Sequence, residues 1–191
     1  MLETIKETAS FITKETNLKP EVAIILGTGL GNIVNDIDII KTLEYTEIPN
    51  FPISTAPGHD GKLIFGKLGG KIVMAMQGRF HYYEGYSMQE ITFPIRVMKW
   101  IGIKYLLLSN ASGGLNPEFE IGDMMIQDDH INLIPNPLIG KHYDEFGDRF
   151  PDMSEPYSKN LIGLAEKIAE KHNIRFQKGC YVAVTGPTLE T

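Results

Sequence analysis

Cysteine and long apolar runs are both scarce in this chain of 191 residues. Cys180 is the only cysteine, which excludes an internal disulfide and a thiolate metal cluster and makes the cytoplasm the expected location. No stretch approaches the ~18 consecutive apolar residues of a membrane span. Residues 1–16 mix Glu and Lys with apolar positions, unlike the apolar core of a signal peptide. We therefore expect a soluble protein.

Positive charge is also in short supply. The chain has 18 Lys and Arg against 24 Asp and Glu, which gives a formal net charge of −6. Nucleic acids and anionic membranes attract proteins through excess positive charge, so we expect neither as a partner. An anionic substrate would need positive groups concentrated at one place.

Short apolar runs alternate with helical patterns, which indicates an α/β fold. The unbroken run Val22–Leu26 is typical of a strand buried on both faces, as in a parallel sheet. Further strands are predicted at 105–108, 124–127 and 181–184, and a hairpin at 62–68 and 71–76. Helices are predicted at 2–12, around 161–168, and from Ser87 to Ile101, where Pro94 predicts a kink or a late start.

A glycine-rich turn, Gly27-Thr28-Gly29-Leu30-Gly31, follows the first predicted strand. Backbone N–H groups of such a turn can converge on an oxyanion, and Thr28 adds a hydroxyl donor. Asn32 stands where the dinucleotide fingerprint requires a third glycine, which argues against a dinucleotide-binding oxidoreductase. A turn of this kind also occurs for purely structural reasons.

Arg79 and His81 are two positions apart, so their side chains point to one side if the backbone is extended. A guanidinium beside an imidazole makes a clamp for an anion, and Glu84 is placed to orient or charge one of them. His59 lies in a loop rich in Pro, Gly and Ser. Together with Thr28 these residues predict an inorganic-phosphate site. The alternatives are an exposed loop histidine at His59 and, for Arg79 and His81, a solvated loop with a surface ion pair.

A second polar loop, residues 110–116, follows the strand predicted at 105–108 and leaves backbone groups open to a ligand. The segment Asp128-Asp129-His130 follows the next strand. Adjacent side chains on a strand point apart and no fourth ligand is nearby, so we expect no metal there.

In this order and spacing the motifs resemble the purine nucleoside phosphorylases of the low-molecular-mass, homotrimeric type. The shared stretches are residues 26–31, 78–85, 110–116, 130–133, 146–151 and 186–191. The resemblance implies a mixed central sheet with helices on both sides, in one domain over residues 1–191. It also implies a homotrimer that uses no metal and no organic cofactor.

The resemblance assigns a role to each matching position. His81 and Glu190 would be the catalytic residues. The implied phosphate ligands are Thr28, His59, Arg79, His81 and the backbone of Ala111; Tyr83 and Phe150 would contact the ribose, with Phe150 reaching a neighbouring subunit; Ala111, Gly113, Leu189 and Glu190 would line the base pocket.

The implied reaction is phosphorolysis of purine nucleosides to the free base and (deoxy)ribose 1-phosphate. Glu190 would accept a hydrogen bond from N1–H, which hypoxanthine and guanine have and neutral adenine lacks, so inosine and guanosine are the expected substrates. Glu190 and the loop at 58–61 argue against the related methylthioadenosine phosphorylases.

The sequence departs from the family at Thr28, Ser112 and Leu189, where serine, alanine and an aromatic residue are usual. It also ends at Thr191, before the further strands and helices of full-length members. The remaining alternative is thus a truncated, catalytically impaired homologue that still binds phosphate.

Overall fold

The computed structural model describes residues 1–27, 29–53 and 61–187. The chain divides into two compact units, Met1–Ala111 and Ser112–Thr191, called here the first and the second unit. A single phosphorylase domain over residues 1–191 stays a prediction.

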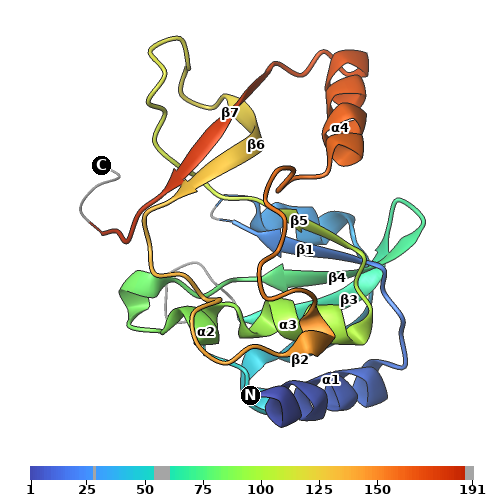
Figure 1. The fold of residues 1–191 in the computed structure, drawn as a ribbon. Helices are drawn as coiled ribbons and strands as arrows, with labels where there is room; N and C mark the ends of the chain where they lie inside the picture. Colours follow the sequence, from blue (N-terminus) through green and yellow to red (C-terminus); the bar gives the residue numbers. More distant parts are fainter. Residues whose placement is uncertain (28, 54–60, 188–191) are drawn as a thin grey trace. The chain divides into compact units, whose positions relative to one another are not determined.

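The first unit contains a five-stranded sheet in the order β2-β3-β4-β1-β5. Its strands are β1 (Val22–Leu26), β2 (Asp38–Glu44), β3 (Lys62–Leu68), β4 (Lys71–Gln77) and β5 (Tyr105–Leu108). Strand β1 pairs in parallel with β4 and β5, whereas β2, β3 and β4 pair antiparallel. The predicted mixed sheet is confirmed, and β4, β1 and β5 end at the same edge (Figure 1).

The hairpin of β3 and β4 turns at Gly69 and Gly70, whose φ angles are +55° and +78°. Two successive positive φ angles are the signature of a primed turn, which the Gly-Gly pair predicted. Strand β2 was not predicted from the sequence. It lies at the edge of the sheet, and a bulge between Ile39 and Lys41 interrupts the alternation that would identify it.

Helix α1 (Leu2–Thr16) packs against α3 (Phe93–Ile101), and both lie on one side of the sheet (Figure 1). The predicted break near Pro94 is confirmed: α2 (Met88–Ile91) ends before α3 begins, and Pro94 occupies the first turn of α3. A proline fits there because its missing N–H has no partner in a first turn.

The two faces of the sheet carry separate apolar layers. Ile64, Val73 and Ala75 form a buried cluster with Ile37, and Val34 of the 3-10 helix η1 (Gly31–Asp36) packs against it. Because side chains alternate along a strand, the neighbouring buried residues Leu63, Phe65, Met74 and Met76 face the other way. A mixed sheet flanked by helical elements is the fold class that the sequence predicted.

The second unit has two parallel strands, β6 (Met124–Asn132) and β7 (Phe176–Ala183), and helix α4 (Lys159–Lys171). Both strands are longer than predicted. The segment Asp128-Asp129-His130 lies within β6, where a register shift between Gln127 and Asp129 accommodates it.

Short 3-10 helices complete the described elements of the two units: η2 (Tyr45–Glu47) and η3 (Tyr82–Glu84) in the first unit, and η4 (Asp144–Phe146) in the second.

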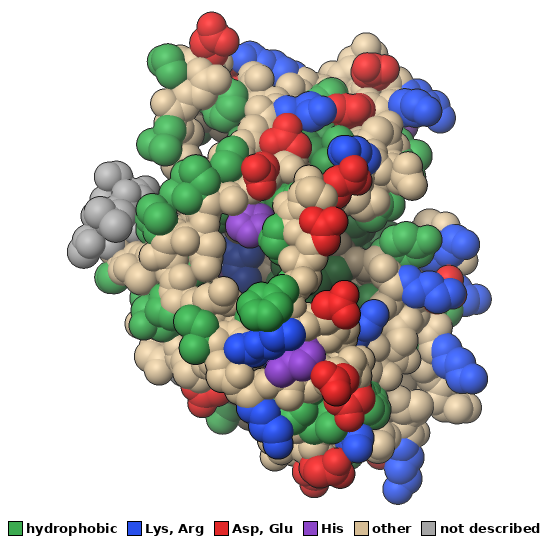
Figure 2. Space-filling view, viewed as in Figure 1, with side chains coloured by type: hydrophobic (Ala, Val, Ile, Leu, Met, Phe, Trp, Pro, Cys, Tyr) green, Lys and Arg blue, Asp and Glu red, His purple; other side chains and the backbone are tan. Residues whose placement is uncertain are grey.

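Within the described ranges, no helix has both the length and the apolar character needed to cross a membrane. Acidic and basic side chains are interspersed over the face shown in Figure 2.

Candidate functional site

Three loops begin where β1, β4 and β5 end. They start at Gly27, Gly78 and Ser109. Since the three strands are parallel neighbours, these loops meet at one edge of the sheet, the edge at which open α/β sheets bind ligands. The predicted glycine turn and the predicted Arg79-His81 clamp both belong to this edge.

The glycine turn is fixed by the loop that follows β5. The N–H of Gly27 donates to Ser109 Oγ over 3.1 Å, and the N–H of Leu30 donates to the carbonyl of Gly27 over 3.1 Å to close the turn. A Cβ on Gly27 would lie 2.4 Å from the carbonyl oxygen of Ser109. Only glycine therefore fits at this close approach of two backbones.

Arg79 donates hydrogen bonds at this edge both to His81 and to the loop that follows β5. Its Nε donates to His81 Nε2 over 3.1 Å, and its Nη1 donates to the carbonyl oxygen of Ser109 over 2.6 Å. Phe80, between Arg79 and His81, is buried on the opposite side of the backbone. This alternation is what the spacing of Arg79 and His81 predicted.

Glu84 holds the imidazole from its other nitrogen. Glu84 Oε1 lies 2.7 Å from His81 Nδ1 and also accepts the backbone N–H of His81 over 2.8 Å. Because Arg79 Nε–H is a donor, His81 Nε2 must accept, which places the imidazole proton on Nδ1 and directs it to Glu84. The side chain of Glu84 is only 3% exposed, as suits an orienting residue.

Tyr83 stacks on His81, with ring centroids 4.9 Å apart and planes inclined by 18°. Tyr83 itself is 53% exposed. An exposed aromatic face beside the clamp suits the sugar contact that the resemblance implied.

Tyr45 supports the clamp from the protein interior, and nothing in the sequence singled it out. Its hydroxyl donates to the carbonyl of Gly78 over 2.7 Å, and its ring packs with Phe51 and Phe80. Burial raises the pKa of Tyr45 far above its usual range, so the hydroxyl stays a donor. Ser109 was likewise missed, although its place directly after the apolar run 105–108 is a usable signal.

The structure describes only some of the remaining predicted residues. Thr28, His59, Leu189 and Glu190 lie outside the described residues. Ala111 is exposed at the end of the first unit, and its carbonyl accepts a 3.3 Å hydrogen bond from Asn110 Nδ2. Gly113 and Phe150 belong to the second unit and are exposed, Phe150 by 88%.

The segment Asp128-Asp129-His130 lies within β6. Residues 1–27, 29–53 and 61–187 contain no group of three or more His, Cys, Asp or Glu side chains suited to a metal ion. His130 Nδ1 is buried without a hydrogen-bond partner in that part of the chain, and its ring meets Tyr157 edge-on at 5.7 Å.

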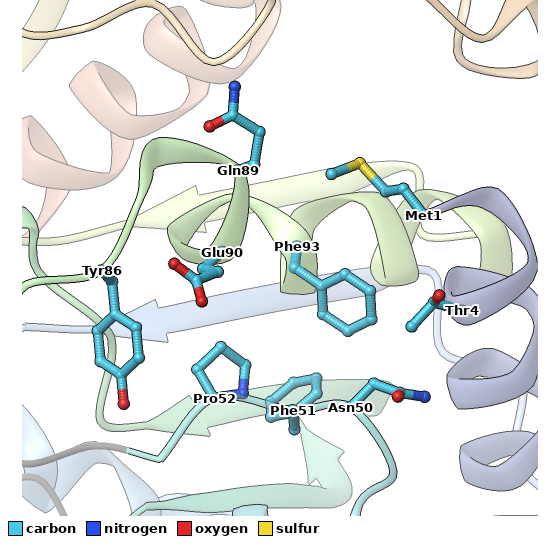
Figure 3. Close-up of a pocket in the computed structure, with 9 residues that line it drawn as sticks. All are labelled: Met1, Thr4, Asn50, Phe51, Pro52, Tyr86, Gln89, Glu90 and Phe93. Atoms are coloured by element: carbon cyan, nitrogen blue, oxygen red, sulfur yellow. The ribbon is translucent and has the colours of Figure 1, made fainter. Parts of the chain in front are cut away.

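A separate hollow lies between the start of α1, the segment 50–52 and helices α2 and α3 (Figure 3). Phe51, Pro52 and Phe93 supply its apolar lining. Glu90 also faces it, but its carboxylate accepts the N–H of Ser87 over 2.7 Å as part of a helix cap. Of the predicted site residues that the structure describes, none lines this hollow, so the loops at the sheet edge remain the candidate site.

The chain is similar to proteins of a known family. Residues 21–191 match the phosphorylase superfamily. The chain is 53% identical over 192 residues to purine nucleoside phosphorylase 1 of Bacillus subtilis (strain 168), covering 100% of this chain and 71% of that relative.

Solved structures of the same kind share the fold. A purine nucleoside phosphorylase in complex with ribose-1-phosphate has a TM-score of 0.94 and 45% identity, covering 100% of this chain and 72% of its own. The Schistosoma purine nucleoside phosphorylase in complex with hypoxanthine has a TM-score of 0.93 and 45% identity, with coverage of 99% and 69%. The chain therefore belongs to the phosphorylase superfamily and, within it, to the purine nucleoside phosphorylases.

Proposed function

We propose that this chain catalyses phosphorolysis of inosine and guanosine and their deoxy forms, giving the free base and (deoxy)ribose 1-phosphate. The array of Arg79, His81 and Glu84, set beside the Gly27 turn where three parallel strands end, is the observation that carries the proposal. Relatives bound to ribose-1-phosphate and to hypoxanthine support it, because these are the two products of inosine phosphorolysis.

Phosphate binds at this array. Arg79 brings a cation into a chain of net charge −6, and a guanidinium matches the geometry of phosphate oxygens. The further ligands that we propose are Thr28, His59, His81 and the backbone of Ala111.

A phosphate oxygen attacks the anomeric carbon of the nucleoside while the bond from that carbon to the purine nitrogen breaks. The ribosyl group is cationic in the transition state, so a correctly placed phosphate supplies the nucleophile and stabilises the developing charge. The purine leaves with the electron pair of the broken bond, and hydrogen bonds stabilise its negative charge.

We assign His81 and Glu190 as the catalytic residues. Tyr83 and Phe150 contact the ribose. The base pocket consists of Ala111, Gly113, Leu189 and Glu190. Glu190 selects 6-oxopurines by accepting their N1–H. The reaction needs no metal or organic cofactor, and we propose a homotrimer in the cytoplasm.

The test is an assay of inosine, guanosine, adenosine and methylthioadenosine, each with and without phosphate. We expect hypoxanthine and guanine to be released only with phosphate, together with one equivalent of ribose 1-phosphate. Release without phosphate, or a preference for methylthioadenosine, would contradict the proposal. Phosphate binding without turnover would identify an impaired homologue instead.

A further inference from the structure

We propose that Ser109 is a positioning residue that links the Gly27 turn to Arg79 and so sets the affinity for phosphate. The inference rests on the proposed function and deepens it. Ser109 is the first residue after β5 and is half-buried. It contacts both of the other loops at this edge of the sheet.

The side chain of Ser109 bonds to β1 and to the turn that follows β1. Its Oγ accepts the N–H of Gly27 over 3.1 Å and donates to the carbonyl of Ile25 over 3.3 Å. The backbone N–H of Ser109 donates to the same carbonyl over 3.2 Å. Since the one hydroxyl proton goes to Ile25, Ser109 acts through Gly27 rather than by donating to phosphate.

The backbone of Ser109 bonds to Arg79. Its carbonyl oxygen accepts Nη1 of Arg79 over 2.6 Å, while His81 Nε2 accepts Nε over 3.1 Å. Two fixed acceptors define the plane of a guanidinium, whose N–H groups have a rigid geometry. Ser109 thus determines where the cation lies relative to the glycine turn.

The two loops are also in direct contact. A Cβ on Gly27 would lie 2.4 Å from the carbonyl oxygen of Ser109 and 2.8 Å from the Cα of Asn110. If either loop shifts toward the other, the second loop must also move. Any displacement of Ser109 is therefore passed to both the N–H groups of the turn and the guanidinium.

The experiment compares Ser109→Ala and Ser109→Thr with the matched control Ser158→Ala. Ser158 Oγ accepts the N–H of Leu161 at the start of α4 in the second unit, so its loss removes a similar hydrogen bond elsewhere. Each variant is assayed for KM of phosphate, KM of inosine and kcat. Phosphate binding is also measured by calorimetry.

We expect Ser109→Ala to raise KM and Kd for phosphate roughly two- to tenfold, the effect of one ordinary hydrogen bond, while KM for inosine changes less than twofold. Ser109→Thr keeps the hydroxyl and should restore phosphate binding. Ser158→Ala should leave both KM values unchanged. An unchanged phosphate Kd in Ser109→Ala, or an equal rise in both KM values, would overturn the proposal.

Gly27→Ala tests the contact independently of the hydroxyl. The new Cβ must displace the Ser109 carbonyl that holds Arg79, so phosphate should bind at least tenfold more weakly even though Ser109 is intact. Unchanged phosphate binding would show that the loops are not coupled. If the wild-type chain binds phosphate without cleaving inosine, the proposed function fails while calorimetry still decides the role of Ser109.

Discussion

Nε of Arg79 and Nε2 of His81 share one hydrogen bond of 3.1 Å, so the cation of the site and its imidazole form a single unit. The bond assigns the acceptor nitrogen of His81 and thereby directs the opposite N–H to Glu84. The orientation of the imidazole therefore depends on groups at both ends of the ring.

Replacement of Glu84 should impair the use of phosphate. Glu84→Ala leaves the Nδ1–H and the backbone N–H of His81 without their buried acceptor, which costs about 1–3 kcal/mol per group. We expect kcat/KM for phosphate to fall on the order of tenfold or more, and less in Glu84→Gln, which keeps an acceptor oxygen. Initial rates at saturating inosine measure this, and equal losses in the two variants would contradict it.

Arg79→Lys should be nearly as damaging as Arg79→Ala. A lysine ammonium cannot reproduce the planar fork that bonds both His81 and Ser109. Loss of a positioned donor of this kind reduces turnover by about 10²–10³. The matched control is Arg175→Lys, at an exposed ion pair with Glu120, which should keep wild-type rates. Normal phosphate kinetics in Arg79→Lys would show that the two hydrogen bonds of the guanidinium, to His81 and to Ser109, are not needed.

Tyr45→Phe should destabilise the fold. The change removes the 2.7 Å hydrogen bond to the Gly78 carbonyl and leaves that acceptor buried, at a cost of about 1–3 kcal/mol. For a chain of this size that lowers Tm by roughly 2–4 °C per kcal/mol. Tyr105→Phe, at a residue that is 48% exposed, is the control and should leave Tm unchanged.

At alkaline pH, wild type and Tyr45→Phe should differ less in their free energy of unfolding. Burial raises the pKa of Tyr45 in the folded state, so the neutral hydroxyl stabilises the fold fully below the ordinary tyrosine pKa of about 10. Above that pH the unfolded chain loses this proton and the folded chain does not, so wild type alone loses this contribution. Denaturant unfolding at pH 8 and above pH 10 measures the difference, and a constant gap would contradict the assignment.

Two glycine-to-alanine changes should have opposite effects. A Cβ on Gly66 in β3 would lie 2.5 Å from both the Asp38 carbonyl oxygen and Ile37 Cγ2, so Gly66→Ala should cost about 1–3 kcal/mol. A Cβ on Gly163 in α4 meets nothing within 4 Å, so Gly163→Ala should stabilise the protein by about 0.5–1 kcal/mol. Thermal unfolding of both variants tests the pair, and similar shifts in Tm would argue against this packing.

Local patterns were sufficient to predict several features of the first unit. The apolar run of β1, the Gly69-Gly70 turn and the helix break at Pro94 each depend on a few neighbouring residues, and the structure confirms all three. The same holds for Arg79 and His81, because an extended backbone places alternate side chains on one side.

Contacts between distant segments could not be predicted in this way. The bonds of Tyr45 to Gly78 and of Ser109 to Gly27 depend on the order of strands in the sheet, which no local pattern contains. Bulges also prevented a correct prediction from the sequence. One interrupts the alternating pattern of β2, and another allows the polar segment 128–130 to continue β6. Thr28, His59 and Glu190 were predicted from motifs and lie outside the described residues.

The meeting of three strand ends has a consequence for how the protein folds. Gly27, Arg79 and Ser109 come together only after long stretches of chain have closed into parallel pairs, and such nonlocal contacts form slowly. An anion whose site requires all three loops binds only to the native state and not to the unfolded chain. By mass action, phosphate at a hundred times its Kd would add about 2.7 kcal/mol to the unfolding free energy. The co-substrate of the reaction would then also be the ligand that keeps the nascent enzyme folded.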